Sequence, residues 1–368
     1  MNITETLTNL TNLQKVLITV ILAVISYSAS TGISYTIFSQ LSGGRGILEE
    51  LASSLPSPSN VVEEDPNEPR TEKCPLDGDM HTKKAKESWE KRRPLAVMIE
   101  NHSEARPQSG LSSSDIVYEA VAEGGITRFM AIFYCNLSDI QVGPVRSART
   151  YFLDWATEYD PLYAHVGGAN TPGPADALGQ IIKYGIKSLN QFGVGFPTYW
   201  RDYQRLGHPV ATEHTMYSTT QKLWEVGAKR EWTNVDEDGI PWDKNFTPWK
   251  FKDDGEDGVS TRLTVNFWQN QGAYSVEWEY DSSLNSYKRK HAGESHLDLN
   301  NNKQISPKNI IIQFQKESRA NDGYEGNLHL LYGTTPSGKA LIFQDGKAVE
   351  GKWIKSLRTS RSKYVDGK

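Results

Sequence analysis

The longest apolar stretch of the chain lies near its N-terminus. Residues 16–38 are mostly apolar and contain no charged side chain. A helix needs about 20 such residues to cross a bilayer, so the pattern predicts a transmembrane helix over residues 16–38. Lys15 flanks its start, which predicts a cytoplasmic tail over residues 1–15. The alternative is a cleaved signal peptide with Val16–Ile25 as its apolar core. Both interpretations place the rest of the chain outside the cytoplasm.

A polar segment follows the apolar stretch. Residues 39–87 are rich in Pro, Ser, Gly and acidic side chains. Such a composition buries too little apolar area to offset chain entropy. The pattern therefore predicts a flexible linker over residues 39–87, which would space a folded body from the membrane.

Residues 88–230 alternate between strand-like and helix-like patterns. Strands are predicted for Pro94–Glu100 and Pro161–Val166, and a hairpin with a Gly-Gly turn for Asp115–Tyr134. Helices are predicted for Val145–Tyr159, after a Gly-Pro stop, and for Ala175–Tyr184. This order favours an α/β (mixed α+β) first domain.

Residues 231–368 show a different pattern, in which short strand-like runs are separated by Gly, Asn and Asp turns. This pattern predicts a smaller, mainly antiparallel β second domain. The predicted strands are Thr261–Trp268, Tyr274–Tyr280, Ile310–Gln315, Leu328–Tyr332, Ala340–Phe343 and Lys352–Leu357. Residues 365–368 read as a turn, so we expect the last strand of this domain to be missing.

Charge and cysteine content narrow the classes of function. The formal net charge of -5 provides no basic field for DNA or RNA, so nucleic acid is not an expected partner. The chain has two cysteines, Cys74 in the predicted linker and Cys135 at the end of an apolar run. We expect two separate thiols, with Cys135 in the core, although one bridge in an oxidising compartment is the alternative. No cysteine comes directly after the apolar N-terminal run, so we expect no lipid-modified cysteine.

The predicted hairpin carries two carboxylates that could do acid–base chemistry. In a regular strand Glu119 and Glu123 share one face, and a two-residue turn would pair Val121 with Arg128. Arg128 would then lie diagonal to both carboxylates. The functional interpretation is a pair of carboxylates whose acid–base chemistry is tuned by a neighbouring cation. A charge-paired sheet face without catalysis is the favoured interpretation.

A second group of candidates follows the Gly143–Pro144 turn. In the predicted helix Arg146 and Arg149 lie on one face of the first turn, with Ser147 between them. Such a pair suits a phosphate or carboxylate ligand. Internal salt bridges are the equal alternative, with three acidic residues as possible partners: Glu119, Glu123 and Asp160.

Three histidines and an aromatic stretch complete the candidates. His102, His165 and His214 could act as general bases, but a lone histidine is more often structural. The spacing matches neither HExxH nor CxxC, so no metal site and no cofactor is predicted. The aromatic residues of Phe196–Tyr203 suit sugar rings or a peptide, and a packed loop is the favoured interpretation.

Several motifs resemble one known family. They are RPLAVMIENH (93–102), ARPQSGL (105–111), DIVYEAVAEGGITRF (115–129), GPVRSAR (143–149) and YAHVGG (163–168), with residues 278–280, 309–312 and 338–353 in the second domain. The chain resembles the YerB-like family, domain-of-unknown-function family 3048, over about residues 89–368. The resemblance implies an envelope protein with two such domains, often a lipoprotein. It carries over no reaction and no catalytic residue.

Together these features predict a membrane-anchored, extracytoplasmic protein. Our leading hypothesis is a binding module for cell-wall material such as peptidoglycan, or for an envelope protein, with ligand-binding residues Arg128, Arg146, Ser147, Arg149 and His214. The alternative is a hydrolase or transferase acting on envelope glycans, with Glu119 or Glu123 and His165 as catalytic candidates. A sensor of small anions, clamped by the two arginines of the Gly-Pro segment, is a third hypothesis.

Overall fold

The computed structural model describes residues 65, 67–255, 261–269, 271–326 and 328–367. The predicted cytoplasmic tail, the predicted membrane span and most of the predicted linker lie outside these residues. Within them, every helix is too short or too polar to cross a bilayer. The described residues all belong to one compact unit.

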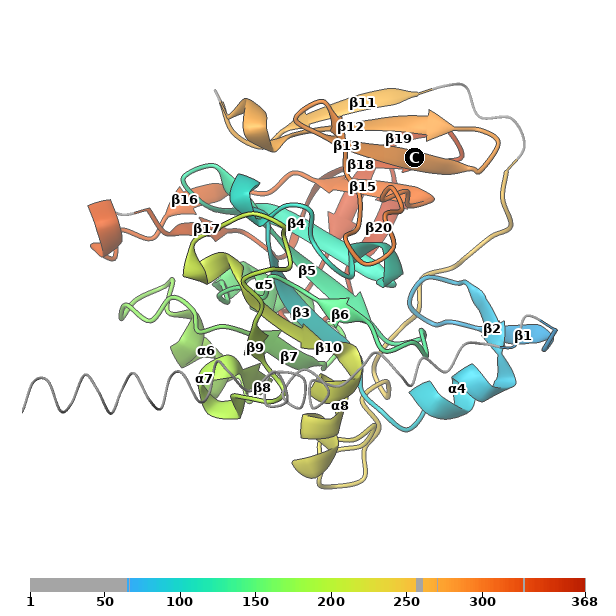
Figure 1. Cartoon of the computed structure of the whole chain (residues 1–368). Helices are drawn as coiled ribbons and strands as arrows, with labels where there is room; N and C mark the ends of the chain where they lie inside the picture. Colours follow the sequence, from blue (N-terminus) through green and yellow to red (C-terminus); the bar gives the residue numbers. More distant parts are fainter. Residues whose placement is uncertain (1–64, 66, 256–260, 270, 327, 368) are drawn as a thin grey trace, which may run out of the picture. The chain divides into compact units, whose positions relative to one another are not determined.

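A mixed five-stranded sheet organises the first half of the chain, with the order β4-β5-β3-β7-β8 (Figure 1). The pairs β4–β5 and β5–β3 are antiparallel, and the pairs β3–β7 and β7–β8 are parallel. The strand bounds are β3 Leu95–Glu100, β4 Ile116–Glu123, β5 Ile126–Phe133, β7 Leu162–His165 and β8 Lys187–Asn190. The predicted strands and hairpin of this half are thus present.

Both faces of this sheet are covered, which explains why β3 is buried at every position. On one face, Met98 and Met130 pack with α5 (Thr150–Ala156). On the other face, Val97 and Ala131 pack with α8 (Thr220–Lys229) through its buried side chains, Leu223 and Trp224. Alternate residues of each strand therefore face two different cores.

Smaller elements surround this sheet. The predicted helix near residues 175–184 is α6, Ala177–Lys183, which Asp176 caps and which ends before Gly185 at a φ of 62°. The other elements of this half are α7 Gln191–Val194, β6 Gln141–Val142, β9 Trp200–Arg201 and β10 Met216–Thr219. The last three form a sheet in the order β6-β10-β9.

The helix predicted from residue 145 is wrong over its first five residues. The segment 145–149 is extended, and α5 begins only at Thr150. The amide of Arg146 donates to the carbonyl of Met98 at 2.9 Å, and its carbonyl accepts from the amide of Val166 at 3.0 Å. Backbone pairing with the ends of β3 and β7 thus overrides the local preference for helix.

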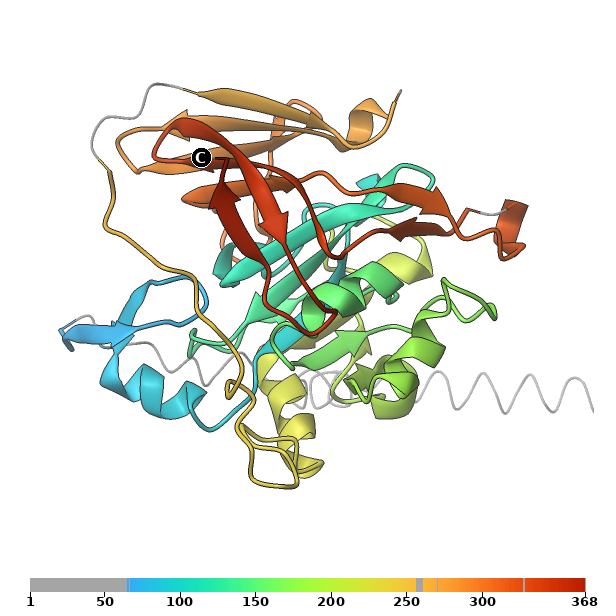
Figure 2. The same ribbon diagram turned by 180° about the vertical axis from the view of Figure 1, so that it is seen from behind.

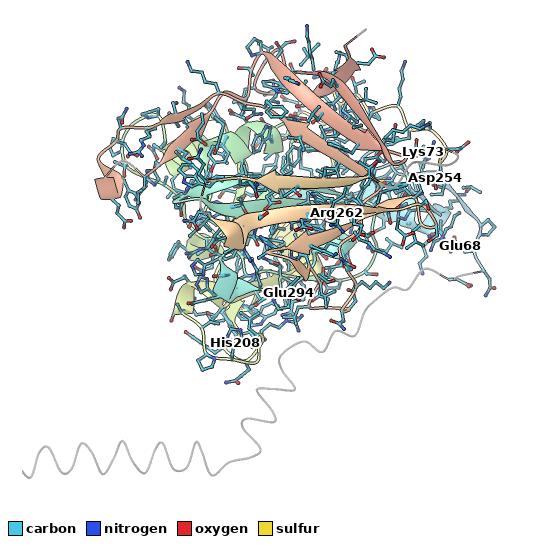
Figure 3. The ribbon with its side chains drawn as sticks, turned by 90° about the horizontal axis from the view of Figure 1, so that it is seen from above. Glu68, Lys73, His208, Asp254, Arg262 and Glu294 are labelled. Carbon is cyan, nitrogen blue, oxygen red and sulfur yellow. A yellow bond between two sulfur atoms is a disulfide. The ribbon has the colours of Figure 1, made fainter. Side chains whose placement is uncertain are left out.

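The second half is built from antiparallel sheets, as predicted (Figures 2 and 3). One sheet has the order β11-β12-β13-β14, another β15-β18-β19-β20, and β16 pairs with β17. The bounds are β11 Arg262–Asn266, β12 Ser275–Asp281, β13 Ser286–His291, β14 Glu294–Ser295, β15 Asn309–Gln313, β16 Glu317–Arg319, β17 Leu330–Tyr332, β18 Ser337–Gln344, β19 Lys347–Ile354 and β20 Lys363–Asp366. Residues 365 and 366, predicted as a turn, lie in β20.

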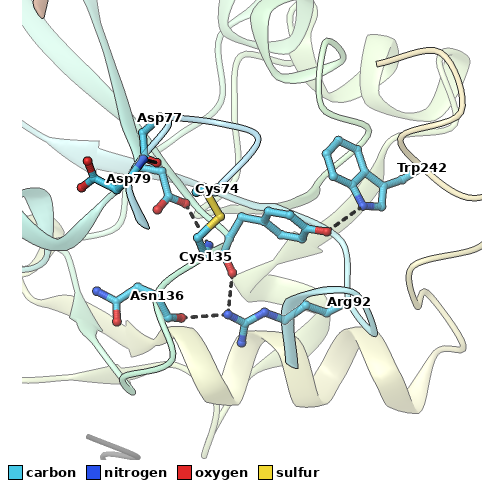
Figure 4. The surroundings of a disulfide bond; sticks show 9 residues. Cys74, Asp77, Asp79, Arg92, Cys135, Asn136 and Trp242 are labelled. Carbon is cyan, nitrogen blue, oxygen red and sulfur yellow. Dashed lines mark hydrogen bonds between the residues drawn. A yellow bond between two sulfur atoms is a disulfide. The ribbon is translucent and has the colours of Figure 1, made fainter. Parts of the chain in front are cut away.

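The end of the predicted linker is folded, and the prediction of two separate thiols is wrong. Strands β1 (Arg70–Lys73) and β2 (Met80–Thr82) pair and lead into α4 (Lys83–Trp89). Cys74 and Cys135 are fully buried and form a disulfide with an S–S distance of 2.03 Å (Figure 4). A covalent tie to the central sheet holds this polar segment in place, although its own apolar content is low.

Candidate functional site

The parallel part of the central sheet brings three polar positions to one edge. Glu100, His165 and Asn190 are the last residues of β3, β7 and β8. The carboxyl ends of neighbouring parallel strands meet at the same sheet edge, where open α/β sheets commonly bind ligands. The extended segment 145–149 reaches this edge through bridges to Ile99 and Gly168. This edge therefore collects most of the candidate residues.

Glu123 and two arginines form the first buried charge cluster. Arg149 donates to Glu123 Oε2 from Nε at 3.0 Å and from Nη2 at 2.6 Å, and Arg128 pairs with Glu123 Oε1. Burial disfavours the charged carboxylate, but the charges of Arg128 and Arg149 prevail and lower the pKa of Glu123. Glu123 was one of the predicted internal partners. The anionic ligand of Arg149 stays a prediction.

Glu100 is the centre of a second cluster and was not among the residues predicted from the sequence. Its Oε2 pairs with Arg146 and lies 3.6 Å from Nδ1 of His214. Burial opposes its charge, yet the contacts with His214 and the arginines lower the pKa of Glu100 to about 2. Ser147 contributes its backbone carbonyl, which accepts from Arg128 at 3.2 Å. The one feature of the sequence that could have indicated Glu100 is its place as an acidic residue at the end of an apolar strand.

A β-bulge separates the two carboxylates that a regular hairpin would align. Glu123 is opposite Ile126 as predicted, but the register shifts between Val121 and Glu123. Arg128 is consequently opposite Ala120, and Glu119 faces the other side of the sheet. The predicted carboxylate pair beside Arg128 is therefore wrong.

Glu119 instead joins the first half of the chain to the second. Its Oε2 accepts from Arg289 of β13 at 2.8 Å, and its Oε1 accepts from Thr127 at 2.8 Å. Arg289 also contacts Nδ1 of His296 at 2.6 Å. Burial lowers the pKa of Arg289, and the charge of Glu119 opposes that shift. This carboxylate is occupied by structural partners.

His165 is held by hydrogen bonds at both ring nitrogens. Nδ1 lies 2.6 Å from the carbonyl of Gly167, and Nε2 lies 2.8 Å from Oγ of Ser188. Burial lowers its pKa to about 4, so the ring is neutral near pH 7. The predicted partnership with Glu119 or Glu123 has no contact to support it among the described residues.

A cavity of about 740 Å³ runs beside His165 along β8. Sites for small molecules commonly measure roughly 300–1,000 Å³. One wall comes from α6 and the turn after it, another from the segment that follows α8. Its lining combines apolar and polar residues: Leu178, Ile181, Trp232 and Val235 with Lys187, Ser188, Asn190, Glu231 and Asp238. Neither Glu119, Glu123 nor Arg149 lines it.

Two exposed aromatic side chains lie in the segment that follows β8, whose last residue, Asn190, lines the cavity. Phe192, on α7, is 77% exposed, and a Cβ at Gly167 would lie 3.1 Å from its ring, so the ring covers the turn after His165. Within the aromatic stretch, Phe196 is 75% exposed, whereas Tyr199 is buried and donates to the carbonyl of Leu189 at 2.5 Å. The predicted packed loop is thus only partly correct.

The fold and its site define a class of two-part proteins, in which a mixed α/β half with a ligand-sized cavity adjoins an antiparallel β half. Two family models match the chain: "Protein of unknown function (DUF3048) N-terminal domain" over residues 81–233 and the C-terminal domain of the same description over residues 263–368. The chain belongs to this DUF3048 family, as the sequence motifs predicted.

Known relatives agree with this assignment. The "Putative lipoprotein YerB" of Bacillus subtilis (strain 168) is 31% identical over 282 residues, which cover 76% of this chain and 77% of the relative. The crystal structure of the YerB protein from Bacillus subtilis superposes with a TM-score of 0.65 at 28% identity, over 81% of this chain and 91% of that one. The likeness extends over both halves of the fold.

Proposed function

We propose that this protein is an extracytoplasmic envelope protein that binds cell-wall glycan in the cavity beside His165. The relative named a lipoprotein supports an envelope location. In this chain the predicted helix over residues 16–38 would provide a single-pass anchor. The disulfide between Cys74 and Cys135 also suits an oxidising compartment.

The observation that carries the proposal is the cavity together with the exposed aromatic side chains of the segment that follows β8. The faces of sugar rings are apolar and stack on aromatic side chains, and Phe192 and Phe196 are both about three-quarters exposed. Ser188 and Asn190 inside the cavity offer hydrogen-bonding groups for hydroxyl and amide substituents. The acidic side chains of Glu231 and Asp238 suit the amino groups of peptidoglycan stem peptides.

The geometry supports binding better than glycan hydrolysis. Glycosidases use two carboxyl groups that flank one bond. Here Glu119 and Glu123 lie on opposite faces of the hairpin, and each is ion-paired with arginine. A general base must also reach a substrate proton, whereas both nitrogens of His165 already have partners.

Co-sedimentation of the full-length chain, in mild detergent, with purified peptidoglycan tests the proposal. We expect saturable binding that weakens about 30-fold in a Phe192→Ala, Phe196→Ala double variant, since the two stacked rings together contribute about 2 kcal/mol. Leu284→Ala is the matched control, because Leu284 is 60% exposed on the second half. Equal binding by all three proteins, or none by the parent, would refute the proposal.

The same supernatants, examined by mass spectrometry, test the alternative. Fragments released by the parent chain and absent with Glu123→Gln would establish a glycan hydrolase instead of a binding module. We expect no fragments, because Glu123 is neutralised by Arg128 and Arg149.

A further inference from the structure

Two histidines and a glutamate meet at the loop after β3, outside the cavity beside His165. His102 and Glu104 belong to the 3-10 turn that follows β3, and His214 ends another 3-10 turn, Thr212–His214. Potential ligand atoms of these three residues all lie within 4.8 Å of one another. From this arrangement we propose that His102, Glu104 and His214 bind one Zn²⁺ ion.

The orientation of His214 is the strongest argument. Its ring is buried, with Nδ1 3.6 Å from Oε2 of Glu100 and Nε2 3.9 Å from Oε2 of Glu104. A carboxylate behind one ring nitrogen is how metal-binding histidines are commonly fixed, so that the other nitrogen faces the ion. Glu100 is itself buried and paired with Arg146, so its carboxylate stays behind the His214 ring, at 3.6 Å as an electrostatic contact and not a hydrogen bond.

His102 presents its ring beside that of His214. The two rings are stacked, with centroids 4.9 Å apart and planes 13° apart. Nδ1 of His102 accepts from the amide of Glu104 at 3.3 Å, which leaves Nε2 as the nitrogen for an ion. Stacking and this hydrogen bond hold the His102 ring next to that of His214 without a metal, so the two imidazoles are already neighbours.

Glu104 supplies the movable third donor. Its side chain is 59% exposed, in contrast to the buried ring of His214. Donors of a tetrahedral zinc ion lie about 3.3 Å apart, given zinc–donor distances of roughly 2.0–2.2 Å. The donor atoms now lie within 4.8 Å of one another, so zinc binding requires the exposed Glu104 side chain to rotate and the stacked His102 ring to tilt toward the ion. Two imidazoles, one carboxylate and an open side are a donor set that zinc accepts, with the fourth position free for water or another donor.

This site could not be predicted from the sequence. More than a hundred residues separate His214 from His102 and Glu104. The short spacings typical of zinc motifs are absent, and we therefore predicted no metal ligand from the sequence. Only the fold brings the two 3-10 turns together at the end of β3.

Zinc titration of the untagged full-length chain, in mild detergent and in competition with a chromophoric chelator, tests the proposal. We expect one Zn²⁺ per chain. His102→Ala and His214→Ala should each weaken binding at least about tenfold, because one of three donors is lost. His208→Ala is the matched control, since His208 is exposed and outside the cluster (Figure 3).

Glu104→Gln keeps the test valid if a histidine variant fails to fold. Because Glu104 is exposed, we expect this variant to retain the thermal unfolding temperature of the parent and still bind zinc more weakly. X-ray absorption at the zinc edge should show a shell with two imidazole ligands in the parent. Absence of stoichiometric binding, or equal affinity in the parent and all variants, would overturn the proposal.

Discussion

At the scale of single residues, the buried charges lie in pairs that join distant parts of the chain. Arg289 of β13 is 2% exposed and meets Glu119 of β4. Arg361 and Lys355 in the second half both contact Glu158, which follows α5. Taking such charges out of water costs several kcal/mol, which only a partner with good geometry offsets. We therefore expect these residues to contribute to the stability of the fold and not to catalysis or ligand binding.

Loss of Glu119 tests this structural role. Glu119→Ala leaves the guanidinium of Arg289 buried without its carboxylate, so we expect the free energy of unfolding to fall by roughly 3–5 kcal/mol. Urea denaturation followed by circular dichroism measures the change. The matched control is Glu350→Ala, because Glu350 is 77% exposed in its pair with Lys339 and should cost less than about 1 kcal/mol. Similar costs for the two variants would contradict the prediction.

His165 should make stability depend on pH. Burial lowers its pKa to about 4 in the folded chain, whereas an unfolded histidine titrates near 6.5. Between these values the unfolded chain binds more protons, so stability falls as the pH is lowered from about 6.5 to 4. The contribution of His165 to this fall is on the order of 3 kcal/mol.

Denaturation at a series of pH values separates His165 from the other histidines. A His165→Gln variant should be less stable than the parent at pH 7 and lose less of its stability on acidification. His208→Gln, at an exposed position, should keep the pH dependence of the parent. An unchanged slope in the His165→Gln variant would show that this ring does not titrate as proposed.

At the scale of elements, strands with a clear apolar pattern were predictable and strands with polar buried faces were not. β3 is apolar and buried throughout, and its prediction is confirmed. β13 was missed because its inward positions include Arg289 and His291, so its polarity does not alternate. The segment 145–149 was misassigned because its conformation depends on pairing with β3 and β7, which no local pattern reveals.

The candidate site was less predictable than the strands, for a related reason. A single extra residue in β4 turns Glu119 away from Arg128, and nothing in the local sequence marks that bulge. The motif arginines were correctly singled out as unusual, but the partner of Arg146 was Glu100, which was not among those considered. The cavity beside His165 depends on residues 231–238, which carry no recognisable motif.

The β1–β2–α4 segment should depend on its disulfide. The bridge closes a separation of 61 residues, for which chain-entropy arguments give roughly 4 kcal/mol. In a Cys74→Ser, Cys135→Ser double variant we expect a lower unfolding temperature and faster proteolysis within residues 67–89. Differential scanning calorimetry and mass spectrometry of the digests measure both effects.

Reductant provides the control for that experiment. It should shift the parent toward the behaviour of the double variant and leave the double variant unchanged. Alkylation of the native parent without reductant should label neither Cys74 nor Cys135, because both are bonded and fully buried. Labelling of either residue would contradict the assignment of the bridge.

At the scale of the whole molecule, the two halves share a polar interface. Asp298 of the second half is fully buried, and its carboxylate accepts from the amides of Gly110 and Ser112 in the first half, at 3.0 and 2.8 Å. In the same interface Nε2 of His296 lies 2.7 Å from Oε1 of Gln108. Buried polar groups of this kind stabilise the contact only while all partners are present.

Because this interface is buried and hydrogen-bonded, we expect the two halves to unfold in one cooperative transition. Asp298→Ala leaves the buried amide of Gly110 and the part-buried amide of Ser112 without an acceptor, which should cost roughly 1–3 kcal/mol. Hydrogen exchange should then increase in both halves, in residues 108–112 as well as around β13. Asp253→Ala, at an exposed position of the connecting segment, is the control and should change neither the transition nor the exchange.

Two separate calorimetric transitions in the parent chain would show that the halves are energetically independent. Increased exchange confined to the second half of the variant would show the same. A single transition would instead mean that a substitution in one half also destabilises the other half. Ligand affinities of variants must then be compared at equal free energy of unfolding.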